Sequence, residues 1–383
     1  MTIRVLHVVV LFDKREGTGR SIVEVASRLP GFEPHLCTTA APYGTNFFSS
    51  VHEVGGSRSL FHVTRSRQIA EVMAIVRPQL THIHGGFMVP FLAKGSALSS
   101  PVVLSIYGWP RIPAPSAIIR SSWQELRKSA VLRARVLAPM VVPPRLVGAA
   151  LNGKKIKGVL TADPKLAARL ACLTSVPVRL ATSGATVDGL RASYEGDRPI
   201  IVFAGRAETA RGADTLISAM PLVLRAFPQA RLRLLLLPAP QLRAIVDLAQ
   251  SLGIRHAVDI DGQPAKQLRA EFARCTLAAF PFKFDHTTAT PPITVTEAMS
   301  VGLPVIGTPV RCMAPVLEPE YNGLLARIGD PASLAAAICS ALKDEALWRA
   351  LSRGAVDTIR TRWNWDSAAS TVSQLYEEVL ASP

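Results

Sequence analysis

The first half of the chain alternates short apolar runs with longer segments whose apolar residues recur at helical spacing. The apolar run over residues 5–11 predicts a strand, and the segment 20–29 predicts the helix that follows it. The same alternation continues over residues 35–39, 69–76, 80–84, 102–106, 158–161 and 178–181. Strand and helix in turn are typical of a parallel, doubly wound sheet.

The pattern starts again after a polar stretch at residues 188–198, which is typical of a linker. The strands and helices expected there are residues 200–205, 213–227, 232–237, 242–252, 258–260, 266–274 and 277–280. A chain of 383 residues is long enough for two hydrophobic cores. We therefore expect an α/β protein with two Rossmann-like domains, residues 1–190 and 191–365, that face a central cleft. A last helix within residues 366–383 is expected to cross back to the first domain.

The five cysteines lie far apart, without the paired spacing of a zinc site or a disulfide framework. This usage suits a reducing cytoplasm. The opening run MTIRVLHVVVLFDKREG has a short apolar core and no small-residue cleavage site, so we interpret it as a strand and not as a signal peptide. Arginines and prolines interrupt the apolar segment 130–151, which argues against a membrane span there.

The net charge is +15, because 43 lysines and arginines face 28 acidic residues. The excess is concentrated between Arg111 and Lys157, where Glu125 is the one acidic residue. Such a surface favours anionic partners such as phospholipid headgroups or phosphorylated substrates, although arginine used for solubility explains the same excess. Nucleic acid is not expected as a partner, because no motif interleaves aromatic with basic residues.

The same basic segment mixes apolar and cationic residues at helical spacing, for example Ile118, Trp123 and Leu126 among the arginines. A helix of this kind suits an anionic membrane surface, so a peripheral location at the cytoplasmic face of the membrane is one interpretation. A core-facing helix with solvated arginines on its back is the other.

The stretch 288–308, TATPPITVTEAMSVGLPVIGT, combines helix, turn and strand signals. Its apolar run ends at Glu297, a helix-compatible AMS follows, and GLPVIGT predicts a tight turn into a buried strand. This interpretation places Glu297 in the first turn of a helix, beside N–H groups that can bind phosphate while the carboxylate accepts ribose hydroxyls. Thr294, Val295 and Thr296 would line the same corner. Compensation of the helix dipole by Glu297 is the alternative.

Two arginines flank the first crossover of the second domain. Gly205 and Arg206 close a predicted strand, and Arg211 stands with Gly212 before the next helix. Guanidinium groups at the carboxyl end of a parallel strand, next to a helix N-terminus, predict a clamp for a diphosphate.

Together with the corner around Glu297, these motifs resemble the retaining glycosyltransferases of family 4, which have the two-domain GT-B fold. Segments in the family's order and spacing are 205–206, 211–212, 296–299, 302–305 and 322–325. In the first domain, Gly17-Thr18-Gly19-Arg20 is similar to the family's glycine-rich loop, and Thr81-His82-Ile83-His84-Gly85 is similar to its HxHG strand end.

The resemblance implies a nucleoside-diphosphate-sugar donor on the second domain and transfer with retained anomeric configuration. Arg206 and Arg211 would neutralise the diphosphate leaving group, and Glu297 would accept ribose hydroxyls. Gly17 and Gly19 would let the backbone approach the donor phosphate or the acceptor.

The resemblance also implies that the acceptor binds the first domain, with His84 and Tyr107 near the reacting centre. No cofactor and no metal ion are expected. The acceptor would be a hydroxyl of a lipid-linked or cell-envelope glycan, or alternatively of a soluble natural product.

The departures from the family concern sugar recognition more than leaving-group binding. Ala289 stands where the family has a second carboxylate, Tyr107 where it has a histidine, and Arg211 where it usually has a lysine. Asp285 and His286, just before Ala289, would restore polar contacts to the sugar; a solvated loop is the alternative. A degenerate GT-B protein that binds a nucleotide sugar or a partner without transfer is therefore a second function, and a GT-B epimerase a third.

Three further features have a structural interpretation beside a functional one. Asp259-Ile260-Asp261 has the spacing of a metal-binding motif from a different glycosyltransferase fold, and we do not expect it to bind metal. His82 and His84 share one strand face by their spacing, and we expect buried, hydrogen-bonded histidines there more than ligands. Trp109 would serve as an acceptor platform or as ordinary packing.

Overall fold

The structure is a computed structural model of the 383-residue chain. It describes residues 2–14, 16–41, 43–55, 66–95, 98–108, 142–237, 241–261, 267–284, 288 and 290–382. The chain divides into two compact units. Unit 1 comprises Met1–Thr182 with Trp365–Pro383, and unit 2 comprises Ser183–Asn364.

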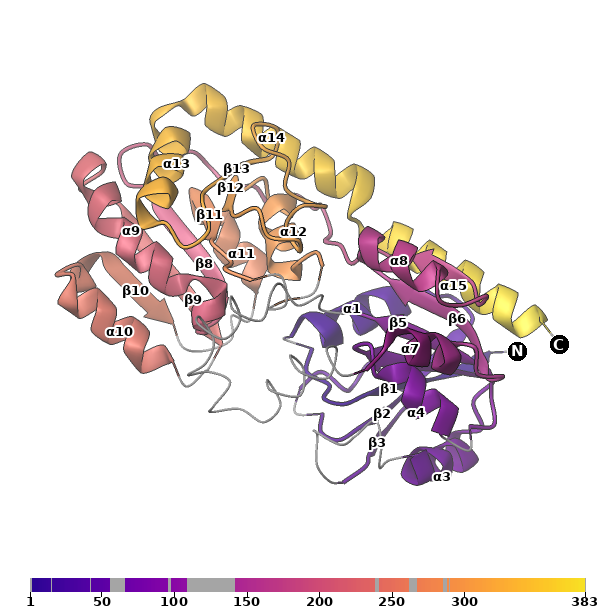
Figure 1. Ribbon diagram of the computed structural model, residues 1–383. Helices are drawn as coiled ribbons and strands as arrows, with labels where there is room; N and C mark the ends of the chain where they lie inside the picture. The colour runs from indigo at the N-terminus through magenta and orange to yellow at the C-terminus, as the bar shows by residue number, and fades with distance from the viewer. Residues whose placement is uncertain are drawn as a thin grey trace. The chain divides into compact units, whose positions relative to one another are not determined.

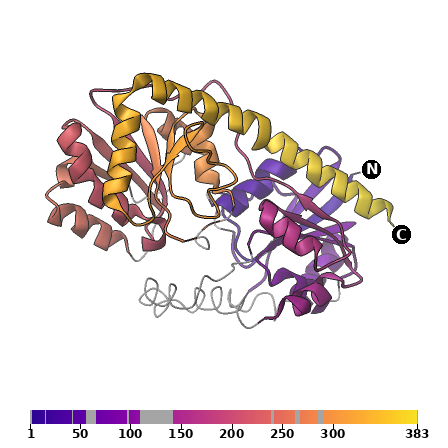
Figure 2. The same cartoon turned by 45° about the horizontal axis from the view of Figure 1, so that its top comes forward.

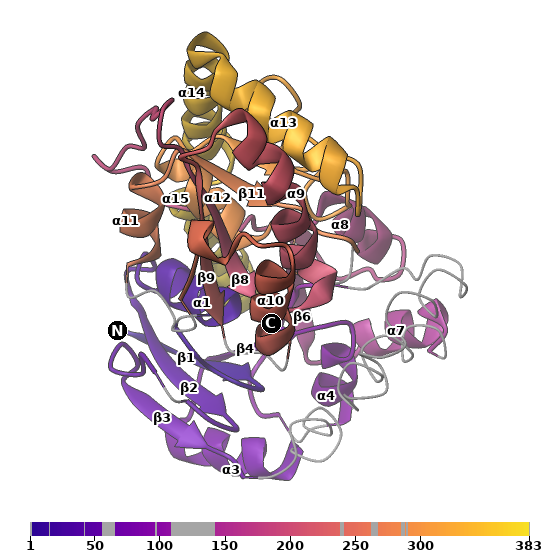
Figure 3. The ribbon, with the colours of Figure 1, turned by 90° about the vertical axis from the view of Figure 1, so that its left-hand side faces the viewer.

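Unit 1 is built on a seven-stranded sheet in which every pairing is parallel, with the order β3-β2-β1-β4-β5-β6-β7 (Figure 1). Its strands are β1 (Ile3–Val9), β2 (Phe32–Thr38), β3 (Ser50–Glu53), β4 (Leu80–Gly85), β5 (Val102–Ile106), β6 (Ile156–Thr161) and β7 (Val178–Leu180). The short strand β3 is one edge of this sheet (Figure 3). Strands this apolar on both faces are typical of a parallel sheet covered on both sides.

Helices cover both faces of this sheet. Those of unit 1 are α1 (Gly17–Ala26), α3 (Ser66–Val76), α4 (Val89–Gly95), α7 (Pro144–Leu151), α8 (Pro164–Ala171) and α15 (Trp365–Ala381). One core contains Leu6, Ile83 and Leu104 of the sheet together with residues of α3, α4 and α7. The opposite core joins Val5 and Leu80 to residues of α15, because alternate strand residues point to opposite faces. The C-terminal helix is therefore part of the fold of unit 1.

Unit 2 has a six-stranded sheet, again with every pairing parallel, in the order β10-β9-β8-β11-β12-β13. Its strands are β8 (Ile200–Arg206), β9 (Arg231–Leu237), β10 (Val258–Asp261), β11 (Leu277–Phe280), β12 (Val305–Gly307) and β13 (Gly323–Leu325). Its α-helices are α9 (Ala213–Ala226), α10 (Leu242–Ser251), α11 (Leu268–Ala273), α12 (Ile293–Ser300), α13 (Pro331–Lys343) and α14 (Glu345–Arg362). Helix α13 packs on α9, and α14 packs on α12 (Figure 2).

The predicted fold class is confirmed, since both units are doubly wound α/β folds with parallel sheets. The strands expected at residues 102–106 and 277–280 have those limits in the structure, and the other expected strands differ by a few residues at their ends. The sequence pattern did not predict β3, β13, α4, α8, α13 or α14. The strands β3 and β13 have four and three residues, too few to show an alternating pattern. The assignment of residues 1–190, 191–365 and 366–383 to two domains and a final helix stays a prediction.

Among the described residues, no helix combines the length and the apolar character needed to cross a membrane.

Candidate functional site

The carboxyl end of β8 brings the predicted arginine pair together. Arg206 is the last residue of β8, and Arg211 lies in the short helix η2 (Thr209–Arg211) that follows. The Cδ atom of Arg211 lies 3.6 Å from the position that a Cβ atom would take on Gly205, so its side chain folds back along the strand end. Both guanidinium groups therefore belong to the same sheet edge.

Arg211 is largely buried, with 16% of its side chain exposed, and its Nε lies 3.5 Å from Glu208 Oε2. Burial lowers the pKa of Arg211, the charge of Glu208 opposes this, and the positive charge of Arg206 lowers the pKa further. An arginine remains charged despite such shifts. Arg206 and Arg211 repel each other where water is partly excluded, so a bound anion would stabilise both. This supports the predicted clamp for a diphosphate.

Gly212 has a backbone that other residues do not tolerate. Its φ angle is +77°, in the left-handed region, and a Cβ atom there would lie 1.9 Å from the carbonyl oxygen of Pro281. This close approach joins the start of α9 to the segment that follows β11. The glycine thus fixes Arg211 next to two adjacent strand ends.

The sequence alone gave the wrong position of Glu297 in its helix. Helix α12 starts at Ile293, directly after Pro292, so Glu297 is its fifth residue and does not lie in the first turn. The β-branched residues Ile293 to Thr296 favour a strand locally, but proline before the first turn and packing in unit 2 impose a helix. A carboxylate in the second half of an eight-residue helix gains nothing from the helix dipole. The alternative that Glu297 compensates the dipole is therefore wrong.

Glu297 is nevertheless buried, with 6% of its surface exposed. Buried carboxylates are rare without a specific role, so the expectation that Glu297 binds ribose stays open.

The three residues before Glu297 occupy different surroundings. Val295 is fully buried in the apolar core, and the Thr296 hydroxyl donates to the carbonyl oxygens of Ile293, at 2.9 Å, and Gly184, at 3.4 Å. Neither side chain has surface left for a ligand. Thr294, in the first turn, is half-buried. The predicted donor contacts of Val295 and Thr296 would therefore have to come from backbone atoms.

The structure adds polar groups that the sequence did not single out. Lys283 follows β11 and forms an ion pair of 2.6 Å with Asp214 in the first turn of α9. Thr308, after β12, donates to the Phe282 carbonyl oxygen at 2.6 Å. The Cys312 thiol is close enough to Arg211 to influence its pKa. The loops after β8, β11 and β12 thus meet at one edge, and only the pairing of distant strands makes this visible.

In unit 1, α1 begins at Gly17. A Cβ atom on Gly19 would lie 2.2 Å from the carbonyl oxygen of Asp13. The loop between β1 and α1 itself therefore requires a glycine at this position, and an approaching ligand is not needed to explain it.

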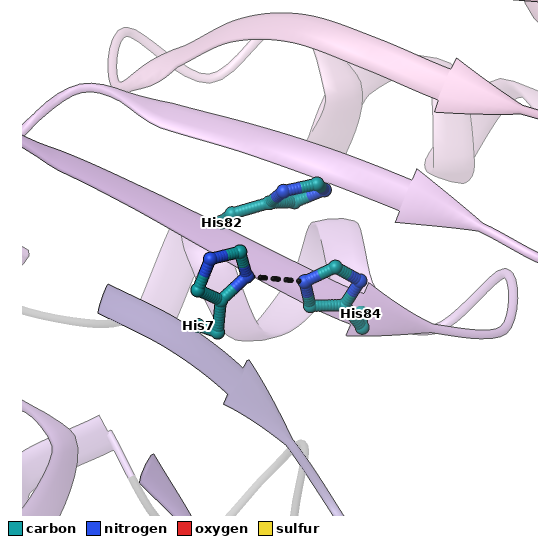
Figure 4. Close-up of side chains that lie close together, drawn as sticks. All are labelled: His7, His82 and His84. Carbon is teal, nitrogen blue, oxygen red and sulfur yellow. Dashed lines mark hydrogen bonds between the residues drawn. The ribbon is translucent and has the colours of Figure 1, made fainter. Parts of the chain in front are cut away.

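The predicted histidine pair is buried and hydrogen-bonded, as expected. His84 is 3% exposed, and its Nδ1 lies 2.8 Å from the Tyr107 hydroxyl. His84 Nε2 lies 3.0 Å from Nδ1 of His7 on the neighbouring strand β1, as Figure 4 shows. The sequence did not identify His7, because its position beside β4 depends on strand pairing.

Residues 198–344 match the family model described as Glycosyl transferases group 1. Unit 2 therefore carries a glycosyltransferase domain. The matched segment includes Arg206, Arg211 and Glu297, so the residues of the candidate site lie inside it. Membership of family 4 stays a prediction.

A D-inositol 3-phosphate glycosyltransferase of Corynebacterium kroppenstedtii is 25% identical over 188 residues, which are 47% of this chain and 41% of the relative. The chain thus spans less than half the length of this relative. An uncharacterized glycosyltransferase of Methanocaldococcus jannaschii is 24% identical over 188 residues, covering 48% of this chain and 46% of the relative.

Solved structures are similar over the whole chain. A sucrose-phosphate synthase from Thermosynechococcus elongatus is 18% identical, with full coverage of both chains and a TM-score of 0.77. HepE of Anabaena, solved with UDP-glucose, is 14% identical over 99% of this chain and all of its own, with a TM-score of 0.73. The chain has the GT-B fold, in agreement with the sequence-based expectation.

Several predicted residues lie outside the described residues, namely Ala289, Asp285, His286, Trp109 and most of the basic segment 111–157. The described end of that segment includes α7, where Arg145 and Leu146 are exposed. In unit 2, Asp259 of the discounted metal motif pairs with Arg231 at 2.8 Å.

Proposed function

We propose that the protein is a retaining glycosyltransferase that moves a sugar from a nucleoside-diphosphate sugar to an acceptor hydroxyl. The observation that carries this proposal is the pair Arg206 and Arg211 at the carboxyl end of β8, inside the segment that matches the glycosyltransferase family. When the bond to the sugar breaks, its electron pair stays on the diphosphate and adds negative charge there, and preorganised cations stabilise this charge in the transition state. HepE, with the same fold, was solved with UDP-glucose, which supports a nucleotide-sugar donor here.

In this proposal unit 2 binds the donor, with the guanidinium groups on the diphosphate and Glu297 on the ribose hydroxyls. The partial burial of Arg211 supports the first role, because a charge-assisted contact gains strength away from water. No bound metal ion is needed for the leaving group when two cations already serve it.

Unit 1 would bind the acceptor, which we propose to be a lipid-linked or cell-envelope glycan at an anionic membrane surface. Exposed Leu146 beside Arg145 on α7, with exposed Lys154 and Lys155 nearby in the chain, supports a peripheral contact of this kind. A soluble natural product as acceptor is the rival. Pelleting with vesicles that contain or lack anionic lipid separates the two: absence of lipid-dependent pelleting at low salt contradicts the membrane contact.

A protein that binds nucleotide sugar without transferring it is the alternative function. The identity of Ala289, where the resembled family has a carboxylate, favours it.

The test is release of nucleoside diphosphate from a panel of nucleotide sugars, together with calorimetric binding of the same compounds. Turnover with at least one donor supports the enzyme. Binding without release under any condition, with acceptors from membrane extracts added, contradicts transfer and favours the alternative.

A further inference from the structure

The sheet of unit 2 has a topological switch point between β8 and β11. Strands β9 and β10 lie on one side of β8, whereas β11, β12 and β13 lie on its other side (Figure 1). The connections after β8 and β11 therefore lead toward opposite edges of the sheet. Open α/β sheets bind ligands outside the carboxyl ends of the two strands at such a point. A charged side chain after either strand is thus well placed for a ligand.

Lys283 lies at this switch point, three residues beyond the end of β11. Its backbone N–H donates to the Ala210 carbonyl oxygen at 2.9 Å, and Ala210 stands directly before Arg211 in η2. The preceding carbonyl oxygen, that of Phe282, accepts the hydrogen bond from Thr308 after β12. Contacts to both neighbouring loops therefore fix the backbone of Lys283 beside that of Arg211.

The side chain of Lys283 is held by Asp214. The ammonium lies 2.6 Å from Asp214 Oδ2, in the first turn of α9, where the helix dipole favours a carboxylate. Asp214 Oδ1 is buried and, within the part of the chain that the structure describes, accepts no hydrogen bond. Moving Lys283 away would leave this carboxylate without its counter-charge, which is costly where water is partly excluded. The cation is therefore held in place before any ligand binds.

The Lys283 ammonium has donors left for a second partner. It carries three N–H donors, and Asp214 is its one hydrogen-bond partner among the described residues. Its side chain is 18% exposed, so a ligand can reach part of it while the ion pair stays in place. A compact ammonium binds phosphate oxygens as a point charge, and partial exclusion of water strengthens that contact.

Arg211 and Lys283 have the same arrangement on adjacent strand ends. Each cation is held by an acidic residue within the segment 208–214, Arg211 by Glu208 at 3.5 Å and Lys283 by Asp214 at 2.6 Å. Their side chains are exposed to similar extents, 16% and 18%. The proposed function places Arg211 on the diphosphate of the donor, and the same anion fits Lys283.

We propose that Lys283 is a third cation of the donor site, which contacts the diphosphate together with Arg206 and Arg211. Asp214 is then a positioning residue, because it holds the ammonium and does not itself touch the anion. This inference rests on the proposed function and assigns a further residue to its donor site. Negative charge that develops on the diphosphate as the sugar leaves is stabilised by a cation that is already in place.

A purely structural ion pair is the alternative, in which Lys283 and Asp214 only join the loop after β11 to α9. The two explanations differ in what Asp214 does. A structural pair needs both charges equally, so its two single variants should lose the same stability and the same affinity for the ligand. A phosphate contact needs the charge of Lys283 alone, and the Asp214 carboxylate repels the anion.

The test is calorimetric titration of the full chain with inorganic pyrophosphate, UDP and GDP. We expect Lys283→Met to weaken binding of pyrophosphate, and of each nucleoside diphosphate that the parent binds, by about tenfold, as loss of one charged contact does. Lys283→Arg should retain most of the affinity. Asp214→Asn should lose less affinity than Lys283→Met, although both variants lose the ion pair and should melt at similar temperatures. Lys343→Met, at an exposed position of α13, is the matched control.

A charge exchange separates the contact from stability. The double variant Lys283→Asp with Asp214→Lys restores an ion pair between the two loops but moves the cation. It should melt near the parent temperature and bind pyrophosphate as weakly as Lys283→Met. Parent-like affinity of the double variant would overturn the contact. Unchanged affinity of Lys283→Met, or equal losses of affinity in Lys283→Met and Asp214→Asn, would do the same.

Failure of this inference differs from failure of the proposed function. With a donor that turns over, Lys283→Met should lower kcat about 10²-fold, as loss of one preorganised donor does, and unchanged turnover contradicts the role of Lys283 alone. Binding of pyrophosphate and nucleoside diphosphates without any transfer contradicts the proposed reaction and keeps Lys283 as a diphosphate ligand. If the parent binds none of these anions, the donor site and the role of Lys283 are both wrong.

Discussion

Units 1 and 2 share a sheet topology but fill their central strands differently. The adjacent strands β1 and β4 of unit 1 carry three histidines, whereas the adjacent strands β8 and β11 of unit 2 bring Phe203 and Phe280 within 6.0 Å between ring centroids. The central strands of unit 1 therefore bury polar rings that hydrogen-bond to one another, whereas the central strands of unit 2 bury aromatic side chains. Burying polar rings in a sheet costs free energy unless the rings are neutral and hydrogen-bonded, as the histidines of unit 1 are.

The largest difference that we expect between the units is in stability at acidic pH, which unit 1 should lose first. Unfolded histidines titrate near pH 6.5, but the pKa of His7 falls to about 3 on folding, and those of His82 and His84 fall well below 6.5. Between these values the unfolded chain binds more protons, so stability falls as pH falls, by about 1.4 kcal/mol per pH unit for each histidine. Above pH 6.5 this contribution is fully present.

Protection of backbone amides against hydrogen exchange, corrected for the intrinsic exchange rate at each pH, should therefore fall in β1 and β4 before β8 and β11 as the pH is lowered from about 7 to about 4.5. Unit 2 has carboxylates with lowered pKa values, such as Asp188 beside Arg269, and these titrate below 3.8. His256→Gln, at an exposed position of unit 2, is the matched control. Equal onset in both units would contradict the comparison.

Removing a charge from the edge of unit 2 should affect the reaction and not the fold. Arg206→Ala is expected to lower kcat about 10²- to 10³-fold, because the leaving diphosphate loses a preorganised cation. Nucleoside diphosphate release measures this, and the melting temperature should remain near that of the parent. Arg225→Ala, an exposed arginine on α9, is the control. Full activity of Arg206→Ala would remove the clamp assignment.

Glu297→Gln should weaken nucleotide binding about tenfold while the fold is retained, since a charged acceptor for ribose hydroxyls becomes a neutral one. Isothermal titration with nucleoside diphosphate measures the affinity. If the affinity stays the same, the buried carboxylate serves the fold of unit 2 and not the ligand.

The smallest expected effect concerns Thr296, whose hydroxyl bonds inside unit 2. Thr296→Val keeps the shape of the side chain but removes donation to the Ile293 and Gly184 carbonyl oxygens, so stability should fall by about 1 kcal/mol. Chemical denaturation measures this loss. Nucleotide affinity should not change. A marked loss of affinity would mean that the Thr296 side chain does contact the nucleotide-sugar donor.

The sequence by itself determined the α/β class, the two parallel sheets, most strand positions and the grouping of Arg206, Arg211 and Glu297 in one domain. These features depend on hydrophobic periodicity and on residues close in the chain, which local patterns report. It placed Glu297 one helical turn too early, because β-branched residues after two prolines resemble a strand until packing selects a helix.

Only the tertiary structure decided which groups meet. His7 and His84 are 77 residues apart and His82 and Tyr376 are 294 apart, yet each pair shares a hydrogen bond. Strand register and the docking of α15 create these contacts, and no local pattern encodes them. Only the three-dimensional structure therefore shows that the histidines of unit 1 hydrogen-bond to one another. It likewise shows the edge of unit 2 at which Arg211, Cys312 and the Lys283 ion pair meet.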